Sequence, residues 1–595
     1  MDAANLVENE RYGLALTDQF VEIHPSSPAK HSTTGFRYQP LPDNSGFIRL
    51  LYLRPQSRTA SIEGRIRLHC EVIIHPVDHC PPYVALSYAW GDATSRKNVK
   101  LGSHVISLTE SLVTALEHLQ HRDKTLVVWA DAICINQTDD VEKGHQVQMM
   151  SRIYKHAVLV VAWLGVESED SDEAIKQLRY FRDLAFSLMS QIDEIESMFD
   201  TSRPGHDATR ELPPCTNAID FLPVKRLLDR PWFDRIWVLQ EAVLNDHTLF
   251  LAGRSILEPD ALFWGGNEWV SSHYSHAHTI DHTRWRRLTP VNVPLELDVF
   301  CSASISLSVF GPNLKCSDPR DYVYGLLGLI EDADRYGLRA DYSLSLEDIY
   351  TNFAIALIRS GNLSFLLRLW CSKTDLNLPS WVPDLRVAQF NTMDTWIDGE
   401  IYQAMLASGD SIHIEDAQAS GNTTPRLVVS GYKLDTIKSV LTSLGKDDPT
   451  QAEQMSFLGE VHDAMSRTNR QNSVAAREGL LSAPAFLLAH LTAYFQPSRA
   501  ELLKYLSSGS ADTNAEWAHL SPCRHLFITN SGLVGLSHSV VAPGDSVFVI
   551  SGTRGQWVLR GGVQDSWYRI VSPATVYPMH LDGEWRSRRE EISLL

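Results

Sequence analysis

The segment YVALSYAWGD, residues 83–92, begins the part of the chain whose pattern decides the fold. It contains an apolar run typical of a buried strand, and alternating helical and strand patterns follow it. The segments that alternate are ESLVTALEHL (110–119), TLVVWADAICI (125–135), QVQMMSRIY (146–154) and AVLVVAWLG (157–165). Such alternation is typical of βαβ units, in which helices cover both faces of a parallel sheet. We therefore expect an α/β domain built on a parallel sheet.

Two strand patterns precede this segment, and a stretch without periodicity precedes both. The strand patterns are FIRLLYL (47–53) and RIRLHCEVII (65–74). Residues 1–40 mix proline, serine, threonine, histidine and charged residues, which is typical of a flexible leader. We therefore expect a leader at 1–40 and a first domain at 41–250.

The rest of the chain changes from helical to strand patterns. Residues 251–395 are expected to form a helical middle region, with its clearest helical patterns in ALFWGG (261–266), YGLLGLI (324–330) and LEDIYTNFAIALI (346–358). Four strand patterns with glycine turns follow: RLVVSGYKLDTI (426–437), HLFITNSGLVGLS (525–537), DSVFVISG (545–552) and QWVLRG (556–561). Residues 396–595 are therefore expected to form a β-rich domain, an antiparallel barrel or sandwich with a helical insertion at about 450–510.

Composition excludes several classes of protein. The 595 residues are 44% apolar and carry a formal charge of −19, so the acidic surface field disfavours binding to nucleic acid. The eight cysteines form no CxxC pair, which favours reduced thiols in a cytoplasmic protein. The longest purely apolar run, residues 157–164, is far shorter than the roughly 20 residues of a membrane span. We expect no membrane span and no secretion signal.

The common catalytic and metal-binding motifs are missing from the sequence. We find no GxxxxGK[ST] phosphate loop, no GxSxG elbow and no HExxH pair. A histidine-rich patch invites a metal interpretation, but serine and threonine separate its members and no cysteine accompanies them. The patch consists of His273, His276, His278, Asp281 and His282. A solvated loop is the favoured interpretation, so no metal site is predicted.

Polar and aromatic residues follow two predicted strands of the first domain. In open α/β sheets, ligands bind at the carboxyl ends of the strands, so these residues are candidate ligand contacts. They are Ser87, Tyr88, Trp90 and Asp92 after the first strand, and Asp131, Asn136 and Gln137 after the second. The alternative is that the Asp and Asn side chains hold their own turns.

A third candidate lies in PWFDRIWVLQEAVL, residues 231–244. If residues 233–244 form one helix, Glu241 lies on an apolar stripe with Phe233, Trp237 and Leu244. A carboxylate in that position either pairs with a cation or lines a cleft. The candidate cations are Arg226, Arg230 and Arg235. In a cleft, Glu241 would suit acid, base or ion-stabilising chemistry, with Trp232 and Trp237 as a stacking wall.

These segments resemble the heterokaryon incompatibility (HET) domain of filamentous fungi. The resemblance rests on PPYVALSYAWGD (81–92), WADAICINQTDDVEKGHQVQMM (129–150) and RPWFDRIWVLQEAVL (230–244), in that order. It continues in CSDPRDYVYGLLGLI (316–330) and in the C-terminal strand patterns. The resemblance implies nonself recognition between fungal cells and cell-death signalling, with protein partners or self-association.

A more distant resemblance links this domain to TIR domains. VALSYAWGD (84–92) looks like the first strand and loop of a TIR domain, and PWFDRIWVLQE (231–241) looks like its tryptophan-containing helix. The resemblance implies a TIR-like fold, a catalytic role for Glu241, and NAD as a possible substrate rather than a cofactor. Three functions remain open: a death-signalling protein, an NAD glycohydrolase, or an interaction module without catalysis.

Overall fold

A computed structural model describes the N-terminal domain, much of the middle region and the C-terminal strands. The described residues are 36–42, 46–56, 67–183, 222–262, 314–361, 363, 374–387, 412–415, 425–443, 460, 525–537, 539–551, 553, 556–562, 567–577 and 589–595. The histidine-rich patch and most of the predicted leader lie outside these residues. The predicted insertion at 450–510 also lies outside them, apart from residue 460.

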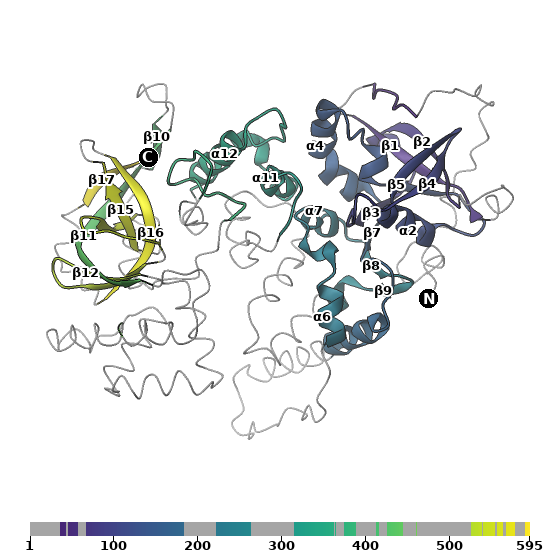
Figure 1. The fold of residues 1–595 in the computed structure, drawn as a ribbon. Helices are drawn as coiled ribbons and strands as arrows, with labels where there is room; N and C mark the ends of the chain where they lie inside the picture. The colour runs from purple at the N-terminus through teal and green to yellow at the C-terminus, as the bar shows by residue number, and fades with distance from the viewer. Residues whose placement is uncertain are drawn as a thin grey trace, which may run out of the picture.

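The N-terminal domain is built on one nine-stranded sheet in the order β5-β4-β2-β1-β6-β3-β7-β8-β9 (Figure 1). The strands in chain order are β1 Phe47–Leu53, β2 His69–Pro76, β3 Val84–Tyr88, β4 Arg96–Leu101, β5 His104–Thr109, β6 Leu126–Trp129, β7 Leu159–Trp163, β8 Thr248–Ala252 and β9 Ser255–Leu257. The predicted strands β1, β3, β6 and β7 are confirmed. β2 begins four residues later than the predicted segment.

The sheet is mixed, which corrects the expectation of a parallel sheet. Only its centre, β6-β3-β7-β8, is parallel, together with the pair β2 and β4. β1 runs antiparallel to β2 and β6, and two hairpins, β4–β5 and β8–β9, form the edges. Each hairpin turns over two residues, Gly102–Ser103 and Gly253–Arg254, and such a short connection joins only antiparallel strands. The strands of these two hairpins were not among those predicted from the sequence, and β9 lies within residues 251–395, which were expected to be helical.

Helices cover the sheet at its centre. α2 (Glu110–Leu119) matches its predicted segment and buries five apolar side chains. α4 (Asp140–His156) extends beyond its predicted segment. It is capped by Asp139, whose carboxylate accepts hydrogen bonds from two backbone N–H groups of the first turn. α7 (Val238–Val243) lies between the sheet and the middle region (Figure 1). Among the described helices, none is both long and apolar enough to cross a membrane.

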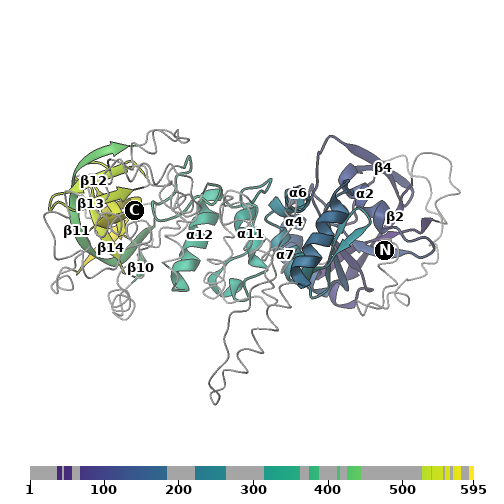
Figure 2. The ribbon, with the colours of Figure 1, turned by 90° about the horizontal axis from the view of Figure 1, so that it is seen from below.

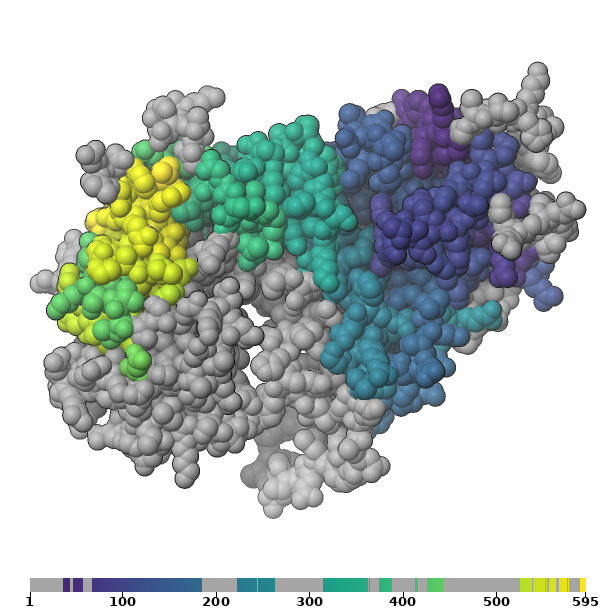
Figure 3. All heavy atoms as spheres, viewed as in Figure 1, coloured from purple at the N-terminus to yellow at the C-terminus, as the bar shows by residue number. Residues whose placement is uncertain are grey.

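The middle region lies between the N-terminal domain and the C-terminal strands in both ribbon views (Figures 1 and 2). Among its described helices, α12 (Leu346–Arg359) matches the predicted segment 346–358, and α11 (Asp321–Leu327) overlaps only residues 324–327 of the predicted segment 324–330. The predicted helical segment 261–266 lies outside the described residues apart from 261 and 262. The space-filling view shows the surface of this region continuing into that of the N-terminal domain (Figure 3). The two are therefore in direct contact.

The C-terminal strands close into a barrel. β11 (Arg426–Ser443) pairs with β12 (His525–Thr529) along its second half and with β14 (Ser546–Ile550) along its middle, so the path β11-β12-β13-β16-β15-β14 returns to β11. The remaining strands are β10 His413–Glu415, β13 Val534–Ser537, β15 Gln556–Gly561, β16 Trp567–Tyr577 and β17 Arg589–Leu594. All pairs are antiparallel except β16 with β17. This β-rich region agrees with the prediction of a β-rich C-terminal domain.

Candidate functional site

Ser87 lies at the centre of a buried polar network in the N-terminal domain. It belongs to β3, whose neighbours on either side are β6 and β7. Its hydroxyl accepts a hydrogen bond from Trp232 Nε1 at 2.8 Å and donates one to the carboxylate of Glu241. Ser87, Trp232 and Glu241 are all buried. The structure therefore brings together one residue of a central strand and two residues from a segment about 150 positions later.

That later segment is not the single helix that the sequence analysis predicted. Residues Pro231–Asp234 form a 3-10 turn, and the α-helix α7 starts only at Val238. Arg235, between them, adopts an extended conformation (φ −82°, ψ 137°) and pairs with the backbone of Lys315. The apolar stripe expected from residues 233–244 is therefore interrupted, because Phe233 and Glu241 lie on different elements.

The cation that faces Glu241 is Arg235. Its Nη1 lies 3.1 Å from Glu241 Oε2, and its Nη2 donates to Oε1 at 3.4 Å. Glu241 is 2% exposed. Burial raises the pKa of the Glu241 carboxyl above its usual value, although Arg235 and the Ser87 hydroxyl both act in the opposite direction. The carboxylate thus has a counter-ion and a hydrogen-bond donor inside the domain.

Two tyrosines and Asp131 surround this ion pair. The Tyr88 hydroxyl is buried without a partner in hydrogen-bonding geometry, and its pKa is raised first by burial and then by the Asp131 carboxylate nearby. Burial also raises the pKa of Tyr154, with the charge of Glu241 as the second cause. Arg235 is the cation that faces this group of oxygens. Its pKa is raised by Glu241 and Asp131 in spite of burial.

Asp131 lies beside the buried network and contacts a residue of the surface. Its Oδ2 accepts a hydrogen bond from Trp90 Nε1 at 2.9 Å, and the Trp90 ring is 42% exposed. Gln137 Nε2 donates to the backbone carbonyl of Asp131 at 2.9 Å. Since Trp90 follows β3 and Asp131 follows β6, these residues lie at the carboxyl ends of adjacent parallel strands, as expected.

Three predicted site residues have other partners. Asp92 Oδ1 accepts from Thr94 N at 2.8 Å, and Asn136 Oδ1 accepts from Thr138 Oγ1 at 2.8 Å, so both side chains hold their own turns. Trp237 Nε1 donates to Asp321 Oδ2 of the middle region at 3.0 Å. These contacts place the three side chains outside the network around Ser87.

Two residues of the network were not predicted as site residues. From the sequence, Arg235 is only one of three possible ion-pair partners of Glu241, and Tyr154 is not distinguished as a site residue. The sequence shows a positive charge at Arg235, six positions before Glu241. Arg230 and Arg226 also carry a positive charge near Glu241, so the sequence does not tell which of the three is its partner. Among the described residues, no group of three or more His, Cys, Asp or Glu side chains is arranged to hold a metal ion.

The class of the domain follows from these features and from comparison with known families. It is a mixed α/β domain with a buried polar network beside its central parallel strands. Residues 83–241 match the family model described as "Heterokaryon incompatibility protein (HET)". This part of the chain, which holds the central strands of the sheet, is therefore similar to the HET domain. The matched range starts just before β3 and ends at Glu241, so it includes every residue of the network around Ser87.

A curated relative extends the similarity beyond this domain. The chain is 29% identical over 407 residues to the protein named "Heterokaryon incompatibility protein 6, OR allele" of Neurospora crassa. The match covers 58% of this chain and 58% of the relative, so it spans little more than half of either protein. No solved structure matches the chain significantly.

Proposed function

We propose that this protein acts in nonself recognition between fungal cells, and that its HET domain triggers an incompatibility response that ends in cell death. The observation that supports this proposal is the match of residues 83–241 to the HET family, together with the name of the curated relative. Protein partners or self-association would carry the recognition. Among the residues that the structure describes, the barrel and the middle region offer surfaces for that contact outside the HET match.

The NAD glycohydrolase remains a second candidate because of where Glu241 lies. In this reaction the bond between ribose C1′ and the nicotinamide nitrogen breaks, and its electron pair goes to the nicotinamide, which leaves neutral. Water then adds its oxygen to C1′ and releases a proton. The oxocarbenium-like transition state is positively charged, and a desolvated carboxylate stabilises such a charge.

The contacts of Glu241 define what catalysis would require. Its carboxylate is buried and paired with Arg235, so a positively charged ribose and the guanidinium would compete for the same oxygens. Catalysis at Glu241 therefore requires Arg235 to move away. In the third candidate, an interaction module without catalysis, the same ion pair only stabilises the domain.

Replacing Glu241 by Gln separates these candidates. The amide keeps the shape and the hydrogen bond with Ser87 but removes the charge. The variant and the wild-type protein are expressed in a fungal strain, and NAD content and cell death are followed after fusion with an incompatible strain. If the glycohydrolase proposal holds, both NAD loss and cell death disappear in the variant.

The matched control is Glu110→Gln, which removes an exposed carboxylate of the same domain that pairs with Lys97. It should behave as wild type. Cell death that persists with Glu241→Gln at normal protein levels would contradict catalysis at Glu241 and favour the interaction module. The incompatibility proposal itself fails if a strain that lacks this gene fuses with every tester strain just as its parent does.

A further inference from the structure

The segment that carries Arg235 is held by residues that lie beyond the HET match. The backbone of residues 234–236 pairs with Lys315 of the middle region, with Ile236 N donating to the Lys315 carbonyl at 3.2 Å. The Lys315 side chain also reaches Asp234 Oδ2 at 3.2 Å. The extended conformation of Arg235 thus depends on a strand-like contact with the middle region.

Side chains of the middle region hold the next turn of this segment. Trp237 Nε1 donates to Asp321 Oδ2, and Tyr342 OH donates to the other oxygen of Asp321 at 2.7 Å. Gln240 Nε2, adjacent to Glu241, donates to the backbone carbonyl of Tyr324 at 3.0 Å in a buried position. The middle region therefore contacts both ends of the segment that joins Arg235 to Glu241, through Lys315 at its start and through Tyr324 of α11 at its end.

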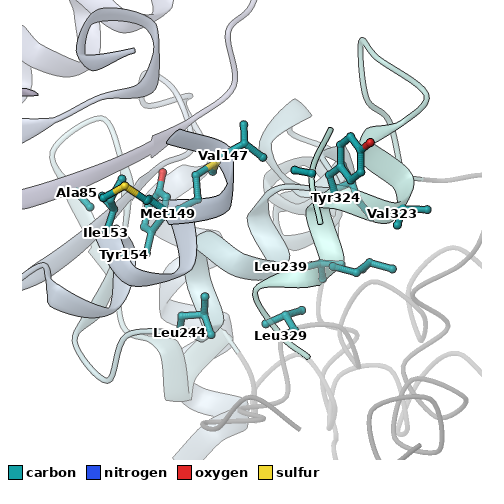
Figure 4. Close-up of a cluster of buried hydrophobic side chains, with 14 of the residues drawn as sticks. Ala85, Val147, Met149, Ile153, Tyr154, Leu239, Leu244, Val323, Tyr324 and Leu329 are labelled. Atoms are coloured by element: carbon teal, nitrogen blue, oxygen red, sulfur yellow. The ribbon is translucent and has the colours of Figure 1, made fainter. Parts of the chain in front are cut away.

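Apolar packing completes the contact, as Figure 4 shows. Val323, Tyr324 and Leu329 of the middle region belong to the same buried cluster as side chains of α4 and α7. Two glycines permit the close approach. A Cβ atom on Gly325 would lie 2.9 Å from Ile236 Cγ1, and a Cβ atom on Gly328 would lie 2.4 Å from Gln240 Oε1 and 2.8 Å from Ser151 Cβ. A larger side chain at either position would therefore displace the neighbouring side chains of the contact.

We propose that residues 315–342 form a clamp that keeps Arg235 on Glu241, and that displacing this clamp uncovers the Glu241 carboxylate. α7 has six residues, fewer than a helix needs to be stable without tertiary contacts. Its position is therefore set by what packs on it, and the middle region supplies the contacts on the side away from the sheet. The functional part of this inference rests on the proposed role of the Glu241 site in the incompatibility response.

The clamp is tested in the full chain with Gly328→Ala, which introduces one methyl group into the contact. Gly328 has φ −68° and ψ −13°, which alanine adopts freely, so the substitution acts through the clash with Gln240 and Ser151 and not through backbone strain. The matched control is Gly144→Ala in α4. Its Cβ would lie 3.8 Å from the carbonyl oxygen of Ala340 in the same interface, which is ordinary van der Waals distance.

Accessibility of Glu241 is measured by carbodiimide coupling of glycine ethyl ester to carboxylates, with the modified residues mapped by mass spectrometry. Hydrogen exchange of residues 234–243 is followed in parallel. We expect Gly328→Ala to raise the labelling of Glu241 by roughly tenfold, because local opening controls access to buried groups. Labelling of the buried Glu142 and Asp545 should stay low, which reports that the domain and the barrel remain folded. Gly144→Ala should label as wild type.

Wild-type labelling of Glu241 in Gly328→Ala would overturn the clamp. If Glu142 becomes labelled to the same extent, the variant has unfolded. Trp237→Phe then decides by the same comparison, since it removes the hydrogen bond to Asp321 and part of the ring but adds no atom to the contact. Cell death without an incompatible partner in a strain that expresses Gly328→Ala would support the functional part. If Glu241 is labelled more strongly but the cellular response is unchanged, the result would support the clamp and contradict the role of Glu241 in that response.

Discussion

At the scale of single residues, a second buried ion pair fixes the fold of the N-terminal domain. Arg49 of β1 contacts both carboxylate oxygens of Glu142 in α4, at 2.5 and 2.9 Å. The guanidinium also donates to the carbonyls of Cys134 and Gln39 and lies 4.9 Å from the centre of the Tyr38 ring. Arg49 and Glu142 are both buried, so neither charge has water as an alternative partner. This pair joins the sheet, α4 and residues 36–42 at one point.

We therefore predict that Glu142→Gln lowers the free energy of unfolding by about 3–5 kcal/mol, because it leaves the Arg49 charge buried without its counter-ion. Chemical denaturation followed by tryptophan fluorescence measures the change. The control is Glu71→Gln, which breaks the more exposed pair with Arg54 and should cost less than about 1 kcal/mol. Equal effects of the two substitutions would contradict this assignment.

The buried thiols of the same domain give a second prediction at this scale. Burial raises the pKa of Cys70 and of Cys134 to about 12, so almost no thiolate forms at neutral pH. In native protein at pH 8, iodoacetamide should leave both residues unmodified, and both should react after denaturation. Rapid alkylation of either residue in the folded chain, detected by mass spectrometry, would show that the core around β2 and β6 opens.

At the scale of elements, α4 and α7 illustrate two ways in which a helix is positioned. α4 has its own start signal, since Asp139 Oδ1 accepts from Val141 N at 3.1 Å and from Glu142 N at 3.0 Å. α7 follows Trp237, whose side chain makes no cap hydrogen bond, and it takes its position from the sheet and the middle region. The start of α4 is thus local, whereas that of α7 depends on distant contacts.

Asp139→Ala should lower the free energy of unfolding by about 1 kcal/mol, because it removes the acceptor for two backbone N–H groups. The neighbouring Asp140→Ala removes a charge from the same turn without removing a cap, and its effect should be near 0.3 kcal/mol. Thermal unfolding of both variants, followed by circular dichroism, tests the difference. The cap interpretation fails if Asp140→Ala proves the more destabilising.

At the scale of the whole molecule, the barrel has a core of its own as well as contacts with the middle region. Phe527, Val547, Val558 and Val576 belong to a buried cluster made only of barrel residues. Other barrel side chains join the cluster that continues into the middle region and the N-terminal domain. Ser380 N donates to the backbone carbonyl of Leu595 at 3.0 Å and thereby connects the middle region to the last strand of the barrel.

The barrel core depends on Gly535 in β13. A Cβ atom there would lie 2.1 Å from the Phe527 ring, so Gly535→Ala should displace that ring and reduce hydrogen-exchange protection in β12 and β13. Protection of β3 and β6 should be unchanged, because the affected cluster contains no residue of the N-terminal domain. Gly561→Ala, whose Cβ would lie 3.5 Å from Tyr568, should leave the barrel intact. Loss of protection throughout the chain would contradict separate cores.

The sequence by itself determined the central strands, α2 and the helices of the middle region, because continuous apolar runs and helical spacing record burial locally. It also singled out Glu241 as a carboxylate among apolar residues. Only the tertiary structure decided that Arg235 is its partner, that the predicted helix at 233–244 is broken, and that the sheet is mixed. For the partner of Glu241 and the broken helix, the physical reason is the same. Arg235 takes its conformation from Lys315, 80 positions away, and Trp237 pairs with Asp321, 84 positions away, and no local pattern encodes such contacts.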